Sequence, residues 1–448
     1  MTTSLSSALQ AQRLALEPDP LAIARRLTAA GLPHVALLHA AEPTGVGPCS
    51  FVAAAPDRAS CAVDPLDDDE GQRLPAGEPL CGVPRWIGVI PYECRRGLER
   101  ASWCAPDHRP APLIRQPQWW RYPAVVQIDH ERGTVAVVGE DPARRARLSD
   151  ALASEPPAPA PVALVLGRQP PDGDHLARVA RARELILAGD LYQVSLARRL
   201  DVTLATGSPL ELYGRMLAVA PSAYGAMLSL ADDTYVVSTS PELLLRAVVE
   251  PGSARSQPPF GALATEPIKG TRPRGTDAAQ DRQLACELDA DPKERAELAM
   301  IIDVERNDLG SVCEVGSVQV ASPPRVVTHR TIHHRKARVV GRSRGDASRG
   351  EVLAAMVPSG SVTGAPKVRA MEVIRQLEEH RRGLYTGGLG FVAHDGSVTL
   401  TMAIRTLVLH GEQGHYWTGG GIVADSDPEM ELQETGWKAL QLLSCADR

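Results

Sequence analysis

The sequence is poor in lysine, in aromatic residues and in long apolar runs. Lysine occurs at only five of the 48 basic positions, so each lysine merits individual attention. No stretch approaches the roughly 18 continuous apolar residues of a membrane-spanning helix. The first residues lack the basic start and apolar run of a secretory signal. We therefore expect a cytoplasmic protein with no membrane partner.

Cysteine spacing and net charge exclude two further classes of protein. The eight cysteines include no Cys-x-x-Cys pair, so neither a zinc site nor a redox motif is indicated. A formal net charge of −6 and a pI near 6.1 argue against a nucleic-acid partner. The 44% hydrophobic and 23% charged residues are typical of a soluble globular protein.

The chain divides by composition into two long regions and a short connection. Residues 154–173 are rich in Ala and Pro and read as a surface connection between residues 1–153 and 174–448. A helix is expected after it, with Asp174 as N-cap and Gly189 as stop. Groups of strand-like runs with helices between them predict an α+β fold with large, mostly antiparallel sheets.

Lys269 stands in the stretch "PIKGTRPRG", before a turn. Arginine keeps its proton near neutral pH, whereas lysine can lose it and act as a nucleophile or base. Taken alone, Lys269 is equally compatible with an ordinary solvated charge. Its role therefore depends on what surrounds it.

Two pairs of glutamates have a spacing that places both carboxylates on one helix face. Glu294 and Glu297 are three residues apart, as are Glu431 and Glu434. Hard oxygen ligands of this kind suit Mg²⁺, which takes one or two protein carboxylates and keeps room for substrate oxygens and water. The same spacing is also common on solvated helices, so the pairs alone do not establish a metal site.

Two other segments invite chemical interpretations that the sequence leaves open. "PSGSVTGAPKVRAME" is not a Walker loop, because Lys367 follows a proline and no Ser/Thr follows it. Its small residues are typical either of backbone amides approaching an anion or of a plain connection before a helix. The histidines of "THRTIHHRK" include His334, for which an acid/base or orienting role competes with an exposed structural cluster.

Nine segments in order resemble one family, the chorismate-utilising enzymes, and within it the aminodeoxychorismate synthase branch. They are "AGDLYQVSLARR", "STSPELLL", "PIKGTRPRG", "DPKERAELAMIIDVERNDLG", "IHHRKARVVG", "PSGSVTGAPKVRAMEVI", "RRGLYTGGLGF", "MAIRTLVL" and "GGGIVADSDPEMELQE". The resemblance implies a large two-sheet α/β sandwich of the anthranilate synthase component I type, with helices outside and a core shared by both regions.

Two positions separate the branches of that family. Relatives that add water to chorismate carry a lysine base where this chain has Gln193, which cannot ionise. Anthranilate synthases carry alanine where this chain has Lys269. The resemblance therefore implies that Lys269 is a covalent catalyst in the conversion of chorismate and ammonia to 4-amino-4-deoxychorismate, a precursor of para-aminobenzoate in folate biosynthesis or specialised pathways. Anthranilate synthase component I and a non-catalytic chorismate-binding protein are the alternatives.

The same resemblance implies roles for the remaining motif residues. Glu242 would be the general acid/base, and His334 would lie near C1 of chorismate. Mg²⁺ would be held by Glu297 and Glu431 with Glu294 and Glu434 beside them. Residues expected to bind or border the substrate are Tyr385, Arg405, Gly421, Lys367, Lys438 and Gln193. The sequence has no Gly-x-Cys-x-Gly nucleophile turn, so ammonia would come from a separate glutamine amidotransferase subunit in a heterodimer.

Overall fold

The strands of this computed structural model form two large sheets. The structure describes residues 9–41, 49–68, 80, 82–97, 107–167, 169–250, 259–330 and 332–446. Within these residues the first sheet has the order β1 (Gln10–Leu14), β8 (Thr134–Gly139), β7 (Ala124–Asp129), β3 (Cys49–Ala53), β2 (Ala36–His39), β11 (Tyr224–Ser229), β12 (Thr234–Ser240), β21 (Thr406–His410), β22 (Gln413–Ile422), β10 (Gln193–Thr206) and β18 (Gly364–Ala365), with β9 (Ala163–Leu166) also on β10.

The second sheet contains the strand that carries Lys269. Its order is β15 (Ile268–Pro273), β17 (Ile332–Arg342), β14 (Phe260–Glu266), β13 (Leu243–Val249), β20 (Val398–Met402), β19 (Gly388–Ala393), β5 (Pro84–Ile90), β6 (Gln118–Arg121) and β4 (Arg58–Ser60), with β16 (Gln319–Thr328) also on β17. The neighbouring strands described in both sheets pair antiparallel, which confirms the predicted α+β class.

The two sheets face one another across an apolar core. Phe51 of the first sheet and Phe391 of the second lie with ring centroids 6.0 Å apart. Strands from residues before 153 belong to both sheets, so the two long regions share this core. Burial of these large apolar faces is the main force that holds the sheets together.

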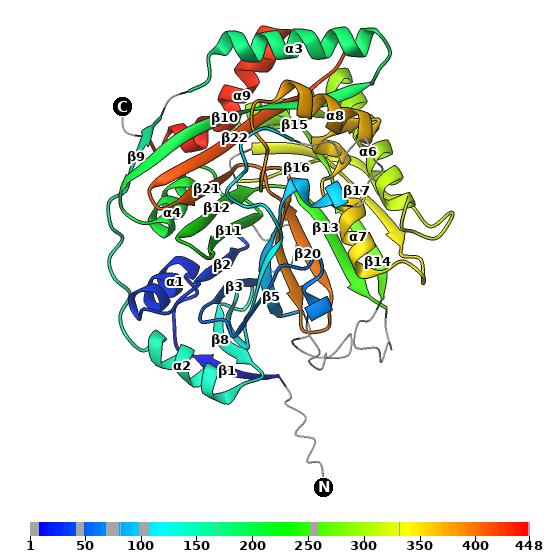
Figure 1. Cartoon of the computed structure of the whole chain (residues 1–448). Helices are drawn as coiled ribbons and strands as arrows, with labels where there is room; N and C mark the ends of the chain where they lie inside the picture. The colour runs from blue at the N-terminus through cyan, green and yellow to red at the C-terminus, as the bar shows by residue number, and fades with distance from the viewer. Residues whose placement is uncertain are drawn as a thin grey trace.

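Helices cover the outer faces of the sandwich. They are α1 (Pro20–Ala29), α2 (Pro142–Leu152), α3 (Asp172–Leu187), α4 (Pro209–Val219), α5 (Ala278–Ala290), α6 (Pro292–Gly310), α7 (Arg349–Met356), α8 (Lys367–Leu377) and α9 (Pro428–Leu443), with short 3₁₀ turns η1 (Pro65–Asp68), η2 (Tyr92–Gly97) and η3 (Gly360–Val362). Figure 1 shows α3 beside α9 at one end of the molecule and α1 with α2 at the other. No helix in the described ranges is long and apolar enough to cross a membrane.

Two local features near the Ala/Pro-rich connection differ from the sequence-based expectation. The expected N-cap at Asp174 is wrong: α3 begins at Asp172, and Pro171 occupies the cap position without a side-chain cap bond. Asp172 and Asp174 lie in its first turn, where the negative charge of a carboxylate stabilises the helix by interacting with the positive end of its dipole. The connection also contributes β9, which pairs with β10. The division of the chain into residues 1–153, 154–173 and 174–448 stays a prediction.

Candidate active site

Lys269 lies at the edge of the second sheet, where the first sheet meets it. Gly421 of β22 passes so close that a Cβ there would lie 3.3 Å from Lys269 Nζ and 2.5 Å from Gln193 Nε2. Lys269 is half-buried, and its amine has no hydrogen bond or ion pair with any residue that the structure describes. Two predicted site residues from distant segments, Gln193 and Gly421, therefore lie beside the Lys269 amine.

Glu242 is a buried carboxyl at the β12–β13 connection. Its carboxylate accepts the backbone N–H of Ile268 and a 3.4 Å bond from Ser361 Oγ to Oε1. Burial and the nearby charge of Glu305 raise its pKa to about 7, against the opposing effect of the Lys269 ammonium. A carboxyl with this pKa exchanges its proton near neutral pH, as a general acid or base requires.

His334 and Arg405 each present polar atoms that have no partner among the residues that the structure describes. Thr271 Oγ1 lies 3.0 Å from His334 Nδ1, while Nε2 is buried with no hydrogen-bond partner among the described residues. Burial and the Arg405 charge lower the pKa of His334 to about 3, so the imidazole is neutral. Because His333 and His334 are both buried, the expectation of an exposed histidine cluster is wrong for them.

Arg405 adopts a strained backbone conformation beside these groups. Its φ is +50°, in the left-handed region that costs energy for a residue other than glycine. The guanidinium forms no ion pair within the described part of the chain, and burial lowers its pKa. A desolvated, unpaired guanidinium provides paired donors for a planar carboxylate.

Tyr385 is a buried residue that packs against β22. Its ring stacks on Trp417 at 5.6 Å with 9° between the planes, and burial raises its pKa to about 12. The charges of both Arg405 and Tyr385 affect the pKa of Tyr416, so both residues lie close to β22. The phenol is therefore held rigidly in its neutral form.

The two glutamate pairs lie near the N-termini of α6 and α9. A Cβ at Gly270, whose φ is +82°, would lie 3.0 Å from Glu294 Oε2, and one at Gly420 would lie 3.0 Å from Glu431 Oε2. Gly270 follows Lys269 and Gly420 precedes Gly421, so both carboxylates border the region around the amine. Because these backbones approach so closely, a side chain at either glycine would collide with a carboxylate.

The electrostatics of these carboxylates fit a cation of few protein ligands. Burial and, after it, the charge of Glu297 raise the pKa of Glu294. Burial and the charge of Glu434 raise the pKa of Glu431, whereas a 2.7 Å hydrogen bond from Ser426 Oγ opposes that rise. Among the described residues, no three His, Cys, Asp or Glu side chains are grouped so that together they could hold a metal ion. Mg²⁺ needs only one or two carboxylates beside substrate and water, so the donor set suits it.

Two lysines near these carboxylates already have protein partners. Lys293 Nζ lies 3.8 Å from Glu297 Oε1, and Lys438 Nζ lies 2.5 Å from Glu434 Oε1 and 2.9 Å from the Gly419 carbonyl oxygen. Lys438 therefore borders the candidate site, as expected from the sequence. Glu294 Oε1 lies 3.5 Å from Arg272 Nη1, so Glu431 is the one carboxylate of the four that forms no ion pair within the described part of the chain.

Lys367 is buried, and its amine is bound by other groups of the protein. Its Nζ bonds to Asp308 Oδ2 at 2.9 Å and to the Ala355 carbonyl oxygen at 3.1 Å. The same loop offers backbone N–H groups to acids of α6, since Gly360 donates to Asp308 at 3.0 Å and Ser361 to Glu305 at 3.3 Å. The anion expected near this glycine-rich loop is thus supplied by the protein's own carboxyls.

Sequence reasoning overlooked Glu305, which is 1% exposed in the middle of α6. Glu305 and Asp308 have the same three-residue spacing as Glu294 and Glu297. That spacing is the signal that could have identified them as a third acidic pair. Their burial, however, follows from packing of α6 against η3 and was not visible in the pattern.

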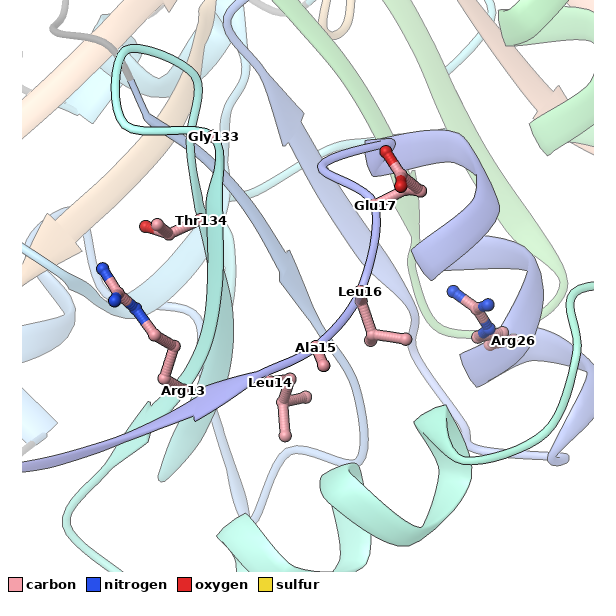
Figure 2. Close-up of a pocket in the computed structure, with 8 residues that line it drawn as sticks. All are labelled: Arg13, Leu14, Ala15, Leu16, Glu17, Arg26, Gly133 and Thr134. Carbon is pink, nitrogen blue, oxygen red and sulfur yellow. The ribbon is translucent and has the colours of Figure 1, made fainter.

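Two cavities in the described structure lie apart from the lysine amine. One, of about 490 Å³, lies beside β1 and is lined by Arg13, Glu17 and Arg26 among others (Figure 2). The second, of about 480 Å³, lies between the sheets and includes Thr401, whose hydroxyl donates to the Glu242 carbonyl oxygen at 2.7 Å. Neither is lined by Lys269, so the candidate site is defined by converging side chains.

Comparisons with known proteins identify the family to which the chain is similar. The chorismate binding enzyme family matches residues 40–444. Anthranilate synthase component 1 of Streptomyces coelicolor is 36% identical over 86% of this chain and 78% of its own length. Aminodeoxychorismate synthase of Streptomyces pristinaespiralis is 38% identical, and the aligned part covers 71% of this chain and 46% of that protein. Anthranilate synthase component I from Streptococcus pneumoniae TIGR4 has a TM-score of 0.68 at 26% identity, covering 98% and 93% of the two chains. The chain belongs to the chorismate binding enzyme family.

Proposed function

We propose that this chain is an aminodeoxychorismate synthase component I, which converts chorismate and ammonia to 4-amino-4-deoxychorismate and water. The observation that carries the proposal is the Lys269 amine beside Gln193 and Gly421 and near the charge of Glu242, without a hydrogen bond or ion pair to any described residue. Lysine supplies a nucleophile at this position, whereas Gln193 supplies no base for water.

The proposed reaction proceeds through a bond between Lys269 and the substrate ring. The neutral amine attacks C2 of chorismate while both ring double bonds shift and the C4 hydroxyl leaves, protonated by Glu242 to water. Ammonia then attacks C4, both double bonds return and the lysine is expelled. Protonation by Glu242 is needed because hydroxide is a poor leaving group.

Substrate positioning in this proposal uses side chains and one backbone amide that lie around Lys269. Arg405, with Tyr385 and the Gly421 amide, would hold the enolpyruvyl carboxylate, and His334 would lie near C1. Glu297 and Glu431, with Glu294 and Glu434, would hold Mg²⁺, which when bound neutralises carboxylate charge. The protein residues themselves orient the ring over Lys269.

Removal of Mg²⁺ is expected to abolish turnover reversibly. The Glu431 carboxylate repels a substrate carboxylate unless a cation lies between them. We expect activity of chelator-treated protein to return on addition of Mg²⁺, with Glu431→Gln needing at least about tenfold more Mg²⁺. Titration of initial rate against Mg²⁺ measures this. Full activity in excess chelator would contradict the metal assignment.

The second candidate function is that of anthranilate synthase component I, the printed name of several relatives. The two functions give different products from the same incubation of chorismate, ammonium and Mg²⁺. We expect 4-amino-4-deoxychorismate, detected by chromatography and by conversion to para-aminobenzoate only after a lyase is added. Anthranilate fluorescence without added lyase would overturn the proposal in favour of the second candidate, and unconsumed chorismate would favour a non-catalytic binding protein.

Ammonia in the proposed reaction is delivered by a separate glutamine amidotransferase subunit. The sequence contains no Gly-x-Cys-x-Gly turn, so we expect the purified chain to use ammonium salts but not glutamine. In the same incubation, glutamine consumption by this chain alone would contradict this part of the proposal.

A further inference from the structure

Glu242 and Glu305 are two buried carboxyls connected by serine hydroxyls. Ser361 Oγ donates to Glu242 Oε1 at 3.4 Å, and the Ser361 N–H donates to Glu305 Oε1 at 3.3 Å. The Ser359 hydroxyl bonds to the same Glu305 oxygen and lies 2.9 Å from the Ser361 hydroxyl, where either can donate. A continuous hydrogen-bonded chain therefore joins the two carboxyls through η3.

The second oxygen of Glu305 has no hydrogen-bond partner in the described structure. Glu305 Oε2 is fully buried, and no Lys or Arg of the described residues forms an ion pair with this carboxyl. The adjacent Lys367 amine bonds to Asp308 instead. An ionised carboxylate with a bare oxygen in the interior is unfavourable, so the geometry favours a Glu305 that holds a proton.

Both carboxyls sit among charges that affect their protonation. The charged and titratable groups that face the pair are Lys269, Arg405 and Tyr224 around Glu242, and Asp308 and Lys367 around Glu305. Burial followed by the charge of Asp308 raises the pKa of Glu305 to about 7, as burial and Glu305 do for Glu242. Two interacting acids of similar pKa titrate as a pair rather than as separate groups.

We propose that Glu242 and Glu305 share a proton through Ser361 and Ser359, and that Glu305 is a positioning residue that reprotonates Glu242 during turnover. The role in turnover rests on the proposed function. After Glu242 gives its proton to the departing hydroxyl, Glu305 donates to Ser359, whose proton passes to Ser361 and from there to Glu242. Addition of ammonia at C4 later releases one proton, which returns to the pair and balances the proton that left in water.

The test compares Glu305→Gln with Asp303→Asn, which removes an exposed carboxylate from the same helix. The first readout is the infrared carboxyl band of the substrate-free protein across pH, which does not depend on the reaction. We expect Glu305→Gln to remove one protonated-carboxyl band and to shift the titration of the Glu242 band to lower pH by about one unit. Asp303→Asn should leave both bands unchanged.

The second readout is the pH profile of kcat/KM with chorismate and ammonium. Since Glu242 must be protonated to act as acid, a lower pKa moves the alkaline limb to lower pH. Above that limb, Glu305→Gln should be about tenfold slower than wild type, with KM for chorismate unchanged. Ser361→Ala keeps both carboxyls but interrupts the chain, so it should lower kcat by about tenfold while both bands remain.

These outcomes separate the further inference from the proposed function. The inference is overturned if Glu305→Gln, folded as judged by circular dichroism, matches Asp303→Asn in both the infrared titration and the pH profile. Coupled infrared titration without formation of 4-amino-4-deoxychorismate would instead support the shared proton while overturning the proposed function.

Discussion

Lys269→Ala is expected to lower formation of 4-amino-4-deoxychorismate by about 10³-fold or more, because it removes the nucleophile of the proposed covalent step. The same change should leave chorismate binding nearly intact, since Arg405 and the acidic helix ends remain. In the absence of ammonia, wild-type protein should gain the mass of chorismate minus water on mixing with chorismate. Intact-protein mass spectrometry of both proteins checks this.

Lys336→Met is the matched control for Lys269→Ala. Lys336 lies on the neighbouring strand β17, and its amine bonds to Glu266 at 2.9 Å. Because Arg338 also contacts Glu266, at 3.3 Å, the carboxylate keeps a cation in this variant. We expect Lys336→Met to retain turnover within a few-fold and to form the same mass adduct. A Lys269→Ala protein with near-wild-type turnover would reduce the proposal to membership of the chorismate binding enzyme family.

The surroundings of Lys269 show what the sequence could predict about the site. Its motif indicated a nucleophile only through resemblance to a family, because local pattern cannot distinguish a reactive lysine from a solvated one. The distinguishing facts are the approach of Gly421 and Gln193 and the absence of a partner for the amine among the described residues. Gly421 lies more than 150 positions along the chain, and such contacts arise only when the sheets assemble.

In the fold as well, elements set by adjacent residues could be predicted from the sequence, whereas pairings between distant segments could not. The hairpin of β7 and β8 around the turn "HERG" was predictable because its alternating residues and turn are adjacent in sequence. The strand β9 was not, since its Ala/Pro-rich surroundings resemble a loop and its pairing with β10 is a property of the sheet. Lys367 was likewise expected at the pocket edge from its motif, whereas its ion pair with Asp308 depends on where the fold places the start of α8 relative to α6.

Glu242→Gln is expected to lower kcat by about 10²- to 10⁴-fold, the usual effect of removing a general acid. The amide keeps the shape and the bond from Ser361 but has no proton to give to the leaving hydroxyl. In the wild type, Glu242 is protonated below its pKa of about 7 and loses the proton above it. We therefore expect kcat/KM to fall as pH rises through 7, and the residual rate of Glu242→Gln to lack that limb.

The matched control for this prediction is Glu250→Gln, at the opposite end of β13. Glu250 forms a surface ion pair with Arg342 at 2.9 Å, so its loss should change stability little and leave the pH profile unchanged. Initial rates measured from pH 5.5 to about 9 for the three proteins provide the comparison. If Glu242→Gln kept the alkaline limb, another group would have to protonate the leaving hydroxyl. His334, whose Nε2 has no hydrogen-bond partner among the described residues, would be the next to substitute.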